Sequence, residues 1–386
     1  MTKKVKLKVM DEVKNARNSK IVVDDKGRVN NKAVGENKKV ASNVIRNSSF
    51  ELLRIIAMLM IIGHHFVVHG GFLDASTVNS WILTFLEFGG KFGVIIYLLI
   101  SGYFMVTSKF TFRKLFKLWC QVWFYSVALY VLSIFLPNFH FSARGLVVAL
   151  FPVLMVEWWF VTYYIFLYLL SPFINKLVKV LSKSEYGWLI VLLLFLYTAL
   201  RLSIGISSIF LMFIIIYLIG GYLRLHPIKK MQKFSISVPC FIMLYLALNI
   251  AQYYLNYHFF ETDRLLMILC AVLLFMIFEK LNIKSKTINI ISSATFGVYL
   301  IHDNLNISPY LWNEVFQNNS YGYSEYLLLY AFLVIVSVFV ICALIDLARK
   351  YLLERPLFKF VDKSCKKYRL KHKNSEVDNT KQITNN

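Results

Sequence analysis

The sequence is poor in acidic residues, prolines and cysteines. Among its 386 residues are 21 Asp and Glu, 7 prolines and 5 cysteines. The cysteines form no CxxC pair and show no paired spacing, so neither a disulfide framework nor a metal site is predicted. No Walker loop, HExxH helix, GxSxG elbow or GxGxxG loop is present. These absences leave P-loop NTPases, zinc peptidases, serine hydrolases and dinucleotide-binding enzymes without their sequence signatures, and we expect no metal cofactor.

Hydrophobic residues are abundant instead. They make up 58% of the chain and include 33 Phe, whereas soluble domains are about 45–50% apolar. The formal net charge of +22 is compatible with nucleic-acid binding, but the basic residues fall in short loops and tails between apolar runs. That distribution is typical of membrane topology rather than of a binding face for nucleic acid. The sequence therefore predicts a polytopic membrane protein whose partner is the lipid bilayer.

The apolar runs predict an all-α membrane bundle of ten transmembrane helices. Lys and Arg alternate between the loops: segments 70–81 and 306–324 contain none, whereas segment 1–49 contains 13 of the 43. By the positive-inside rule, both termini are then cytoplasmic. The ten predicted spans lie near residues 50–69, 82–106, 115–136, 157–175, 187–204, 206–223, 234–254, 263–280, 289–305 and 325–348.

Polar composition divides the chain into three parts. Residues 1–46 are rich in Lys and Asn, lack hydrophobic periodicity and predict a disordered basic cytoplasmic tail. Residues 47–357 contain all of the predicted spans, and residues 358–386 form a second basic cytoplasmic tail. No apolar segment lies near Met1, so a cleaved signal peptide is not predicted.

The first span carries more polar chemistry than a lipid-facing helix tolerates. Its sequence, FELLRIIAMLMIIGHHFVVHG, includes Arg54 and His65. A charged side chain at the centre of a membrane helix costs roughly 2.5–3.5 kcal/mol, so such residues usually serve function or pair with a partner. Eleven positions return to within about 20° of the same helical face, which puts Arg54 and His65 about 16 Å apart along one wall. His64 points about 100° away from His65 and has a different role. We expect Arg54 and His65 to line one passage.

Two further ionisable pairs have a purely structural interpretation beside the functional one. Glu51 and Arg54 are spaced i,i+3, and Glu87 and Lys91 are spaced i,i+4, so each pair can neutralise its own charges. For Glu87 and Lys91, a stabilising ion pair and a functional role are equally favoured. For Arg54 together with His65, function is favoured.

Other local features are compatible with simple packing or topology. Ser101 and Gly102 permit close helix approach, and His302 lies near the outer end of the ninth predicted span. Trp159 falls where an interfacial Trp belt is expected. The segment KFTFRKLFKLW forms an electropositive rim suited to a phosphate-bearing ligand, and ordinary topology explains it equally well; its relevant residues are Arg113, Lys114 and Lys117.

Four blocks in a fixed order give the chain a family resemblance. NSSFELLRIIAMLMIIGHHFVVHGGF, GGKFGVIIYLLISGYFMV, WWFVTYYIFLYLLSPFIN and TFGVYLIH together resemble acyltransferase family 3, the integral-membrane O-acyltransferases, over about residues 45–357. The wording HHFVVHGGF, GGKFGV and FKLWCQVWFYS is similar to members linked to capsular or exopolysaccharide clusters of Gram-positive bacteria. The chain has SGY where many members have SGF.

The resemblance implies an activity and a site. Such enzymes take an acyl group, usually acetyl, from cytoplasmic acyl-CoA and deliver it to a hydroxyl of an envelope polysaccharide or its lipid-linked precursor. By the family motif, Arg54 and His65 are the catalytic pair, with His65 taking a proton or holding the acyl group transiently. Arg113, Lys114, Lys117 and Ser101 are candidate donor-binding residues, and Glu51, His64, Glu87, Lys91, Trp159 and His302 are supporting residues. The expected location is the bacterial plasma membrane.

The alternative from another class is a polytopic transporter or flippase for a glycan or related envelope precursor. Such a protein also needs intramembrane charge, but it often shows internal repeats with broken spans. No convincing repeat relates the two halves of this sequence. Acyl-CoA binding or slow hydrolysis distinguishes the enzyme from the transporter.

Overall fold

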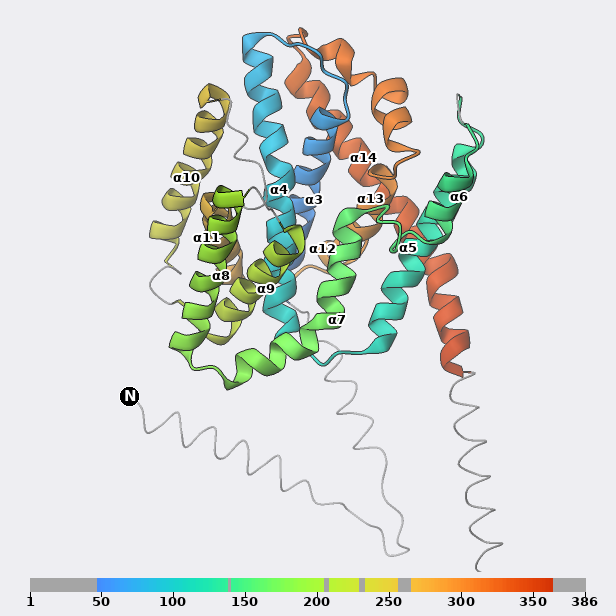
Figure 1. Ribbon diagram of the computed structural model, residues 1–386. Helices are drawn as coiled ribbons and strands as arrows, with labels where there is room; N and C mark the ends of the chain where they lie inside the picture. The colour runs from blue at the N-terminus through green and yellow to red at the C-terminus, as the bar shows by residue number, and fades with distance from the viewer. Residues whose placement is uncertain (1–46, 138–139, 205–207, 229–232, 256–264, 364–386) are drawn as a thin grey trace, which may run out of the picture. The chain divides into compact units, whose positions relative to one another are not determined.

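The computed structural model describes residues 47–137, 140–204, 208–228, 233–255 and 265–363. Every regular element in these residues is a helix, which confirms the predicted all-α fold (Figure 1). The predicted tail 1–46 and most of the tail 358–386 lie outside the described residues. The described part of the chain belongs to one compact unit that begins at Asn47.

Helices α3 (Ser49–Val68) and α4 (Thr77–Met105) form the centre of the bundle. They pack closely because α4 carries glycines where α3 crosses it. A Cβ at Gly90 would lie 2.2 Å from Cγ of His64, so only glycine allows this approach. Gly102 allows a similar approach to α9 (Ile209–Leu225), since its Cβ would lie 2.2 Å from the Tyr217 carbonyl oxygen. The predicted close helix approach is confirmed at Gly102.

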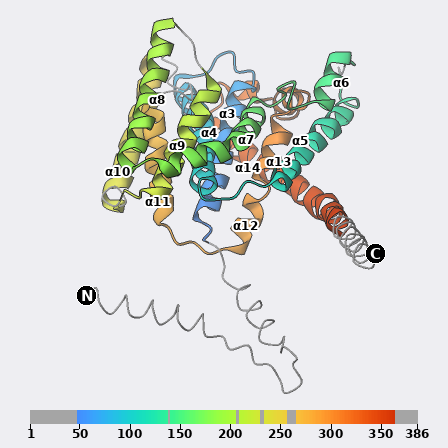
Figure 2. The same ribbon diagram turned by 60° about the horizontal axis from the view of Figure 1, so that its bottom comes forward.

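The other helices surround this pair on two sides. Helices α8 (Lys183–Ile204), α10 (Phe234–Leu255) and α11 (Leu265–Lys280) lie with α9 on one side. Helices α5 (Phe112–Ser133), α6 (Ala143–Leu150) and α14 (Leu327–Arg349) lie on the other, and α7 (Trp159–Val180) lies between them (Figures 1 and 2). From α14, helical structure continues through η3 (Lys350–Glu354) to Lys363.

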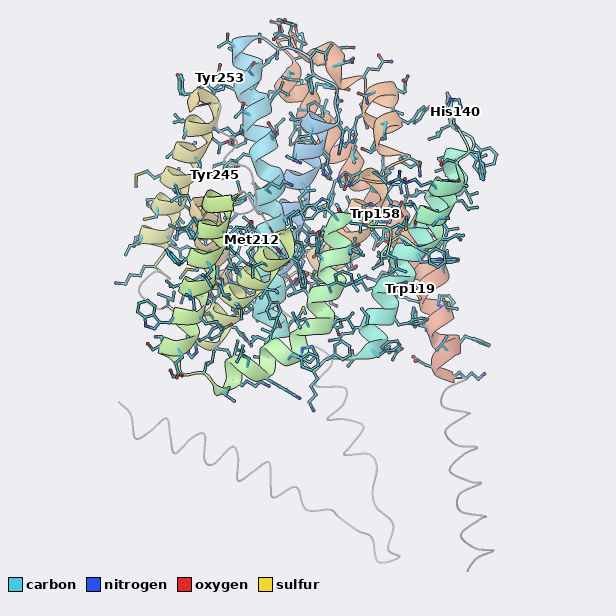
Figure 3. All side chains as sticks on the ribbon, in the orientation of Figure 1. Trp119, His140, Trp158, Met212, Tyr245 and Tyr253 are labelled. Carbon is cyan, nitrogen blue, oxygen red and sulfur yellow. The ribbon has the colours of Figure 1, made fainter. Side chains whose placement is uncertain are left out.

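Apolar side chains cover the outer faces of the bundle as well as its core. Trp158 is buried between helices, whereas Trp119 on α5 is 42% exposed (Figure 3). Phe195 on α8 and Phe332 on α14 are also exposed. In water such surfaces would promote aggregation, and in a bilayer they contact lipid.

Seven helices in the described residues are long and apolar enough to cross a membrane: 49–68, 77–105, 112–133, 159–180, 183–200, 234–254 and 327–363. Each overlaps one of the ten predicted spans. Helix α9 is apolar but has 17 residues, and α11 has 16. The total of ten spans and the cytoplasmic location of both termini stay predictions.

The predicted span near 289–305 differs from the structure. It consists of two short helices, α12 (Lys286–Ser292) and α13 (Thr295–His302), with a break at residues 293–294. Hydroxyl groups at the break bond locally instead of facing lipid: Thr295 Oγ1 donates to the Ser292 carbonyl oxygen at 2.9 Å. Such bonds compete with helical hydrogen bonding and end the helix. The break also lets Ser292 Oγ donate to Glu51 at 2.8 Å.

The segment after α13 ties the ends of α3 and α4 together. It contains η1 (Tyr310–Val315) and η2 (Asn318–Tyr321). Asn318 Nδ2 donates to the Phe66 carbonyl oxygen at 3.1 Å, and Asn79 Nδ2 donates to the Gly322 carbonyl oxygen at 2.9 Å. These bonds link the segment after α13 to the carboxyl end of α3 and to the first turn of α4.

Candidate functional site

The site begins with a pair of histidines from α3 and α13. His65 lies near the carboxyl end of α3, and His302 is the last residue of α13 and fully buried. Nδ1 of His65 lies 2.9 Å from Nε2 of His302, and Nδ1 of His302 lies 2.6 Å from the carbonyl oxygen of Val298. The packing of α13 against α3 therefore brings together two residues that are 237 positions apart.

These distances determine where the ring protons lie when both imidazoles are neutral. A carbonyl oxygen only accepts, so His302 Nδ1 carries a proton and donates to Val298. His302 Nε2 is then an acceptor, and His65 Nδ1 donates to it. Nε2 of His65 is left with a free lone pair. The arrangement suits a base or a ligand to a cation.

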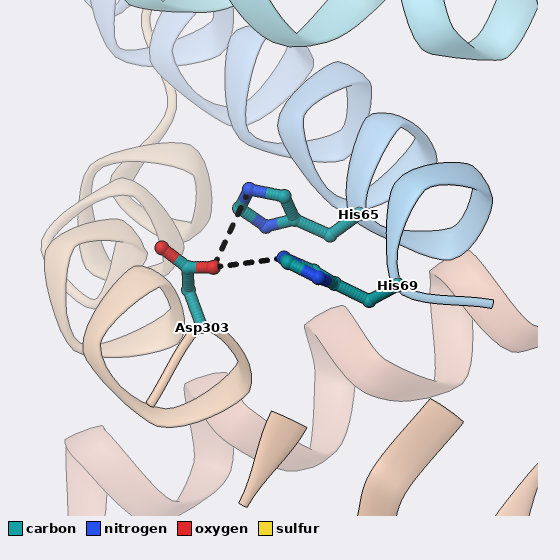
Figure 4. Close-up of side chains that lie close together, drawn as sticks. All are labelled: His65, His69 and Asp303. Atoms are coloured by element: carbon teal, nitrogen blue, oxygen red, sulfur yellow. Dashed lines mark ion pairs between the residues drawn. The ribbon is translucent and has the colours of Figure 1, made fainter. Parts of the chain in front are cut away.

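Asp303 lies next to that lone pair. Its Oδ1 is 3.5 Å from Nε2 of His65 and 3.5 Å from Nε2 of His69 (Figure 4). His65 and His69 are one helical turn apart on α3, so their rings face the same way. The side chains of His65 and Asp303 are 12% and 16% exposed, whereas that of His69 is 41% exposed. A proton taken up by His65 would be stabilised by the carboxylate of Asp303.

A cavity of about 320 Å³ opens beside these residues, and we call it the outer pocket. His64, His65, His69 and Asp303 contribute to its wall. So do Lys91, Glu157 and Trp159, together with the apolar residues Met58, Ile61, Val68, Val94 and Leu305. The pocket thus combines a free imidazole nitrogen with one cationic and two acidic side chains in largely apolar surroundings.

Lys91 and Glu87, both on α4, each contact a residue of another helix. Lys91 makes no ion pair within the described residues; its Nζ lies 4.9 Å from the centre of the Trp159 ring. The ion pair with Glu87, one of the two interpretations that the i,i+4 spacing allowed, is therefore not formed, and the ammonium group lies near the Trp159 indole instead. The backbone of Glu87 has a separate role: its carbonyl oxygen accepts from His64 Nδ1 at 2.7 Å. His64 and His65 thus have different partners, as predicted.

Glu157 is buried at the wall of the outer pocket although it precedes α7. Its Oε1 accepts from Asn304 Nδ2 at 2.8 Å, and its Oε2 accepts from the hydroxyl of Ser126. Asn304 directly follows Asp303 in the chain. Glu157 therefore joins α5 and the α13 end to the segment before α7.

A second cavity, which we call the inner pocket, has a volume of about 410 Å³. Glu51, Arg54, Ser101 and Lys117 all line it. Arg54 pairs with Glu51, which confirms the predicted i,i+3 pair. Lys117 Nζ lies 3.7 Å from Glu354 Oε1, and Ser101 Oγ donates to the Tyr97 carbonyl oxygen at 2.8 Å.

The other two residues of the predicted basic rim lie elsewhere. Arg113 is exposed and pairs with Asp362, and Lys114 is exposed as well. Neither lines the inner or the outer pocket. Of the three basic rim residues, Lys117 is the one that lines the inner pocket.

Three aromatic residues line both pockets: Tyr97, Phe160 and Phe296. The Tyr97 hydroxyl donates to the Arg54 carbonyl oxygen at 3.0 Å, which fixes this ring against α3. Arg54 and His65 therefore line two cavities that share these three aromatic residues, which we call the aromatic partition. The predicted single passage along Arg54 and His65 stays a prediction.

Several residues of the site were missed by the sequence analysis as site residues. The spacing of His65 and His69, four residues apart on one helix, is a local signal that could have identified His69. Asp303 and Glu157 have no such signal, because only tertiary packing brings them to α3. The aromatic partition is likewise invisible among 33 Phe and 23 Tyr.

Comparison with known proteins identifies the family of the chain. A family model described as an acyltransferase domain matches residues 47–346, which is well over half of the chain. Searches of the curated proteins and of the solved structures found no match. The family match supports an acyltransferase over the transporter alternative. The chain belongs to acyltransferase family 3, and its apolar helices make it a membrane acyltransferase.

Proposed function

We propose that this protein is an O-acyltransferase that moves an acetyl group from cytoplasmic acetyl-CoA to a hydroxyl of a cell-envelope polysaccharide or its lipid-linked precursor. The observation that carries this proposal is the free Nε2 lone pair of His65 at the wall of the outer pocket. A second pocket with Arg54 and Lys117 lies on the other side of the aromatic partition. The two cavities suit two substrates that meet between them.

In the proposed reaction, His65 Nε2 removes the proton from the acceptor hydroxyl as its oxygen attacks the thioester carbonyl carbon. A new C–O bond forms and the carbonyl oxygen becomes negatively charged. When the carbonyl re-forms, the C–S bond breaks and the CoA thiolate leaves. The imidazolium of His65 returns its proton to that sulfur. The products are the acyl ester and CoA.

Neighbouring charges favour this sequence of steps. Asp303 Oδ1, 3.5 Å from His65 Nε2, stabilises the imidazolium while it holds the proton. Lys91 supplies a positive charge in the same pocket for the oxyanion. His302 accepts from His65 Nδ1 and so holds the ring with Nε2 toward the pocket. His302 is a positioning residue, because it acts through His65.

The inner pocket is the proposed donor site. Arg54 and Lys117 place two cationic groups there for the phosphates of CoA, and Ser101 offers a hydroxyl beside them. Arg113 and Lys114 would form the outer part of this rim, with the Arg113–Asp362 pair opening for the nucleotide. The acyl-bearing arm of CoA would then pass Tyr97, Phe160 and Phe296 to reach His65.

The acceptor and the location rest on the sequence resemblance to capsular and exopolysaccharide members from Gram-positive bacteria. We place the protein in the bacterial plasma membrane with both termini in the cytoplasm, since the basic loops alternate as the positive-inside rule requires. The inner pocket would then open toward cytoplasmic acyl-CoA and the outer pocket toward the envelope.

The proposal is tested with purified protein in lipid nanodiscs and acetyl-labelled acetyl-CoA. We expect binding and slow release of labelled acetate without an acceptor. Replacing His65 with alanine should lower that hydrolysis by about 10²–10⁴-fold, the contribution of a positioned general base. The exposed His140→Ala is the matched control and should retain the full rate.

A cellular measurement completes the test. NMR spectra of the envelope glycan from cells with and without the protein should differ in O-acetyl signals. Full O-acetylation by a stably expressed His65→Ala protein would overturn the proposed role of His65. Absence of any acetyl-CoA binding or hydrolysis would overturn the proposed donor.

A further inference from the structure

Three side chains at the outer pocket bring possible metal ligands close together. His65, His69 and Asp303 each offer one ligand atom, and these atoms all lie within 4.8 Å of one another (Figure 4). The two imidazoles come from successive turns of α3, with ring centres 5.1 Å apart, and the carboxylate approaches from the end of α13. This is the only group of three such side chains found within the described residues.

The separations fit a shared cation better than direct hydrogen bonds. Oδ1 of Asp303 is 3.5 Å from each Nε2, which is longer than the usual 2.7–3.2 Å of an N–H···O bond. In a tetrahedral zinc site with ligand bonds of about 2.0–2.2 Å, neighbouring ligand atoms are about 3.3–3.6 Å apart. Two imidazoles and one carboxylate are also a common ligand set of zinc sites that keep an open position.

The hydrogen bonds around His65 prepare it to bind a cation. A metal-bound imidazole normally donates its other N–H to a neighbouring acceptor, which fixes the tautomer and the ring orientation. His65 Nδ1 donates to His302, and His302 donates to the Val298 carbonyl oxygen. The free Nε2 of His65 is thus held toward Asp303 before any cation arrives.

The site also has an entrance and room for a fourth ligand. All three residues line the outer pocket of about 320 Å³, and the side chain of His69 is 41% exposed. A cation can therefore reach the three atoms from the pocket, and a water molecule can complete the coordination. These are the features that a metal site must combine: ligands, spacing, oriented rings and access.

We infer that His65, His69 and Asp303 form a binding site for a divalent cation of the zinc type, and that occupation of this site blocks acyl transfer. The blocking part rests on the proposed function of His65. A lone pair that is bound to a cation cannot accept a proton, so the cation and the acceptor hydroxyl compete for Nε2. Zinc would then act on this enzyme as a reversible inhibitor. The absence of a CxxC or HExxH pattern led the sequence analysis to expect no metal.

Binding is tested first, without reference to activity. Chelator-treated protein in nanodiscs is titrated with Co²⁺, and visible absorption is recorded together with the bound metal per chain. We expect one Co²⁺ per chain, the absorption bands of tetrahedral coordination, and loss of those bands when Zn²⁺ is added. His69→Gln and Asp303→Asn should each weaken binding by about tenfold or more.

A histidine in another part of the bundle provides the control. His226→Gln, at the end of α9, should bind Co²⁺ as the unmodified protein does. The thermal midpoint of each variant shows whether it is folded. If the unmodified protein binds no Co²⁺, or if folded His69→Gln and Asp303→Asn both bind it with unchanged affinity, the metal site is overturned.

Inhibition is tested separately by measuring acetyl-CoA hydrolysis against Zn²⁺ concentration. We expect inhibition that a chelator reverses, and an inhibitory concentration about tenfold or more higher in His69→Gln. If the protein binds Zn²⁺ but its rate of acetyl-CoA hydrolysis does not change, the proposed inhibition is overturned and the metal site itself stands. Metal binding without any acetyl-CoA hydrolysis would overturn the proposed function and leave the site.

Discussion

His65 Nδ1 lies 2.9 Å from Nε2 of His302, and this contact leaves the opposite nitrogen of His65 free at the outer pocket. His302 lines neither the outer nor the inner pocket, and we expect it to act by holding the ring of its partner. In the proposed reaction His65 takes the proton and His302 orients His65. Substitution of His302 should therefore have a different effect from substitution of His65.

Replacement of His302 should therefore lower turnover without weakening donor binding. We expect His302→Leu to reduce kcat by about 10- to 100-fold, part of the factor of 10²–10⁴ that a positioned base contributes, with KM for acetyl-CoA unchanged. His302→Gln, whose amide oxygen still accepts from His65 Nδ1, should restore a large part of kcat. Equal losses in both variants, or a rise in KM alone, would show that His302 does not orient His65.

Loss of the Asp303 charge should slow the reaction through the imidazolium of His65. Asp303→Asn is expected to lower kcat by about tenfold, or about 1.4 kcal/mol of barrier, because the amide cannot stabilise the protonated ring to the same extent. Asp74→Asn is the matched control: Asp74 is an exposed acceptor for the Tyr323 hydroxyl. Steady-state rates of both variants check this prediction, and equal rates would refute it.

The aromatic partition should select the length of the acyl group. Phe296→Ala removes a ring that lines both pockets, so it should raise the rate with hexanoyl-CoA relative to acetyl-CoA by about tenfold or more. Phe173→Ala removes a ring of the same size from the exposed face of α7 and should leave the ratio unchanged. Competition between the two donors measures the ratio directly. An unaltered ratio in Phe296→Ala would mean that the acyl group does not pass this ring.

Lys117 should contribute more to donor binding than its neighbour Lys114. Lys117 lines the inner pocket, whereas Lys114 is exposed away from both pockets. We expect Lys117→Gln to raise KM for acetyl-CoA about tenfold, since a hydrogen bond to a charged group contributes roughly 1.5–3 kcal/mol, and Lys114→Gln to raise it by much less. The same order should appear in equilibrium binding of CoA. A larger effect of Lys114→Gln on KM would show that the donor binds at the exposed part of the basic rim and not in the inner pocket.

Gly90 should be essential for the fit between α3 and α4. A Cβ at this position would lie 2.2 Å from Cγ of His64, so Gly90→Ala should destabilise the protein by about 1–3 kcal/mol and displace the histidine segment. In Gly187→Ala on α8, the nearest atoms are 3.8 Å from the new Cβ, and the higher helix propensity of alanine should stabilise the protein by up to about 1 kcal/mol. Thermal unfolding followed by tryptophan fluorescence compares the two. Similar midpoints would show that the helices separate easily here.

The sequence alone was enough to predict the properties that are set within a single helix. The apolar runs predict an all-helical membrane protein, and the i,i+3 spacing predicts the pair of Glu51 with Arg54. Helical periodicity also placed His65 on a face different from that of His64. These properties follow from 3.6 residues per turn and from the cost of placing polar groups in lipid.

Packing between distant helices decided the rest. Lys91 turns to Trp159 of α7 rather than to Glu87, and the break at residues 293–294 divides a predicted span into two short helices. His65 meets His302 and Asp303 only because α13 ends beside the carboxyl end of α3. Periodicity within a helix gives the direction of a side chain but not the identity of the helix that faces it. The chemistry of His65 was therefore readable in the first span, while its partners became visible only in the folded chain.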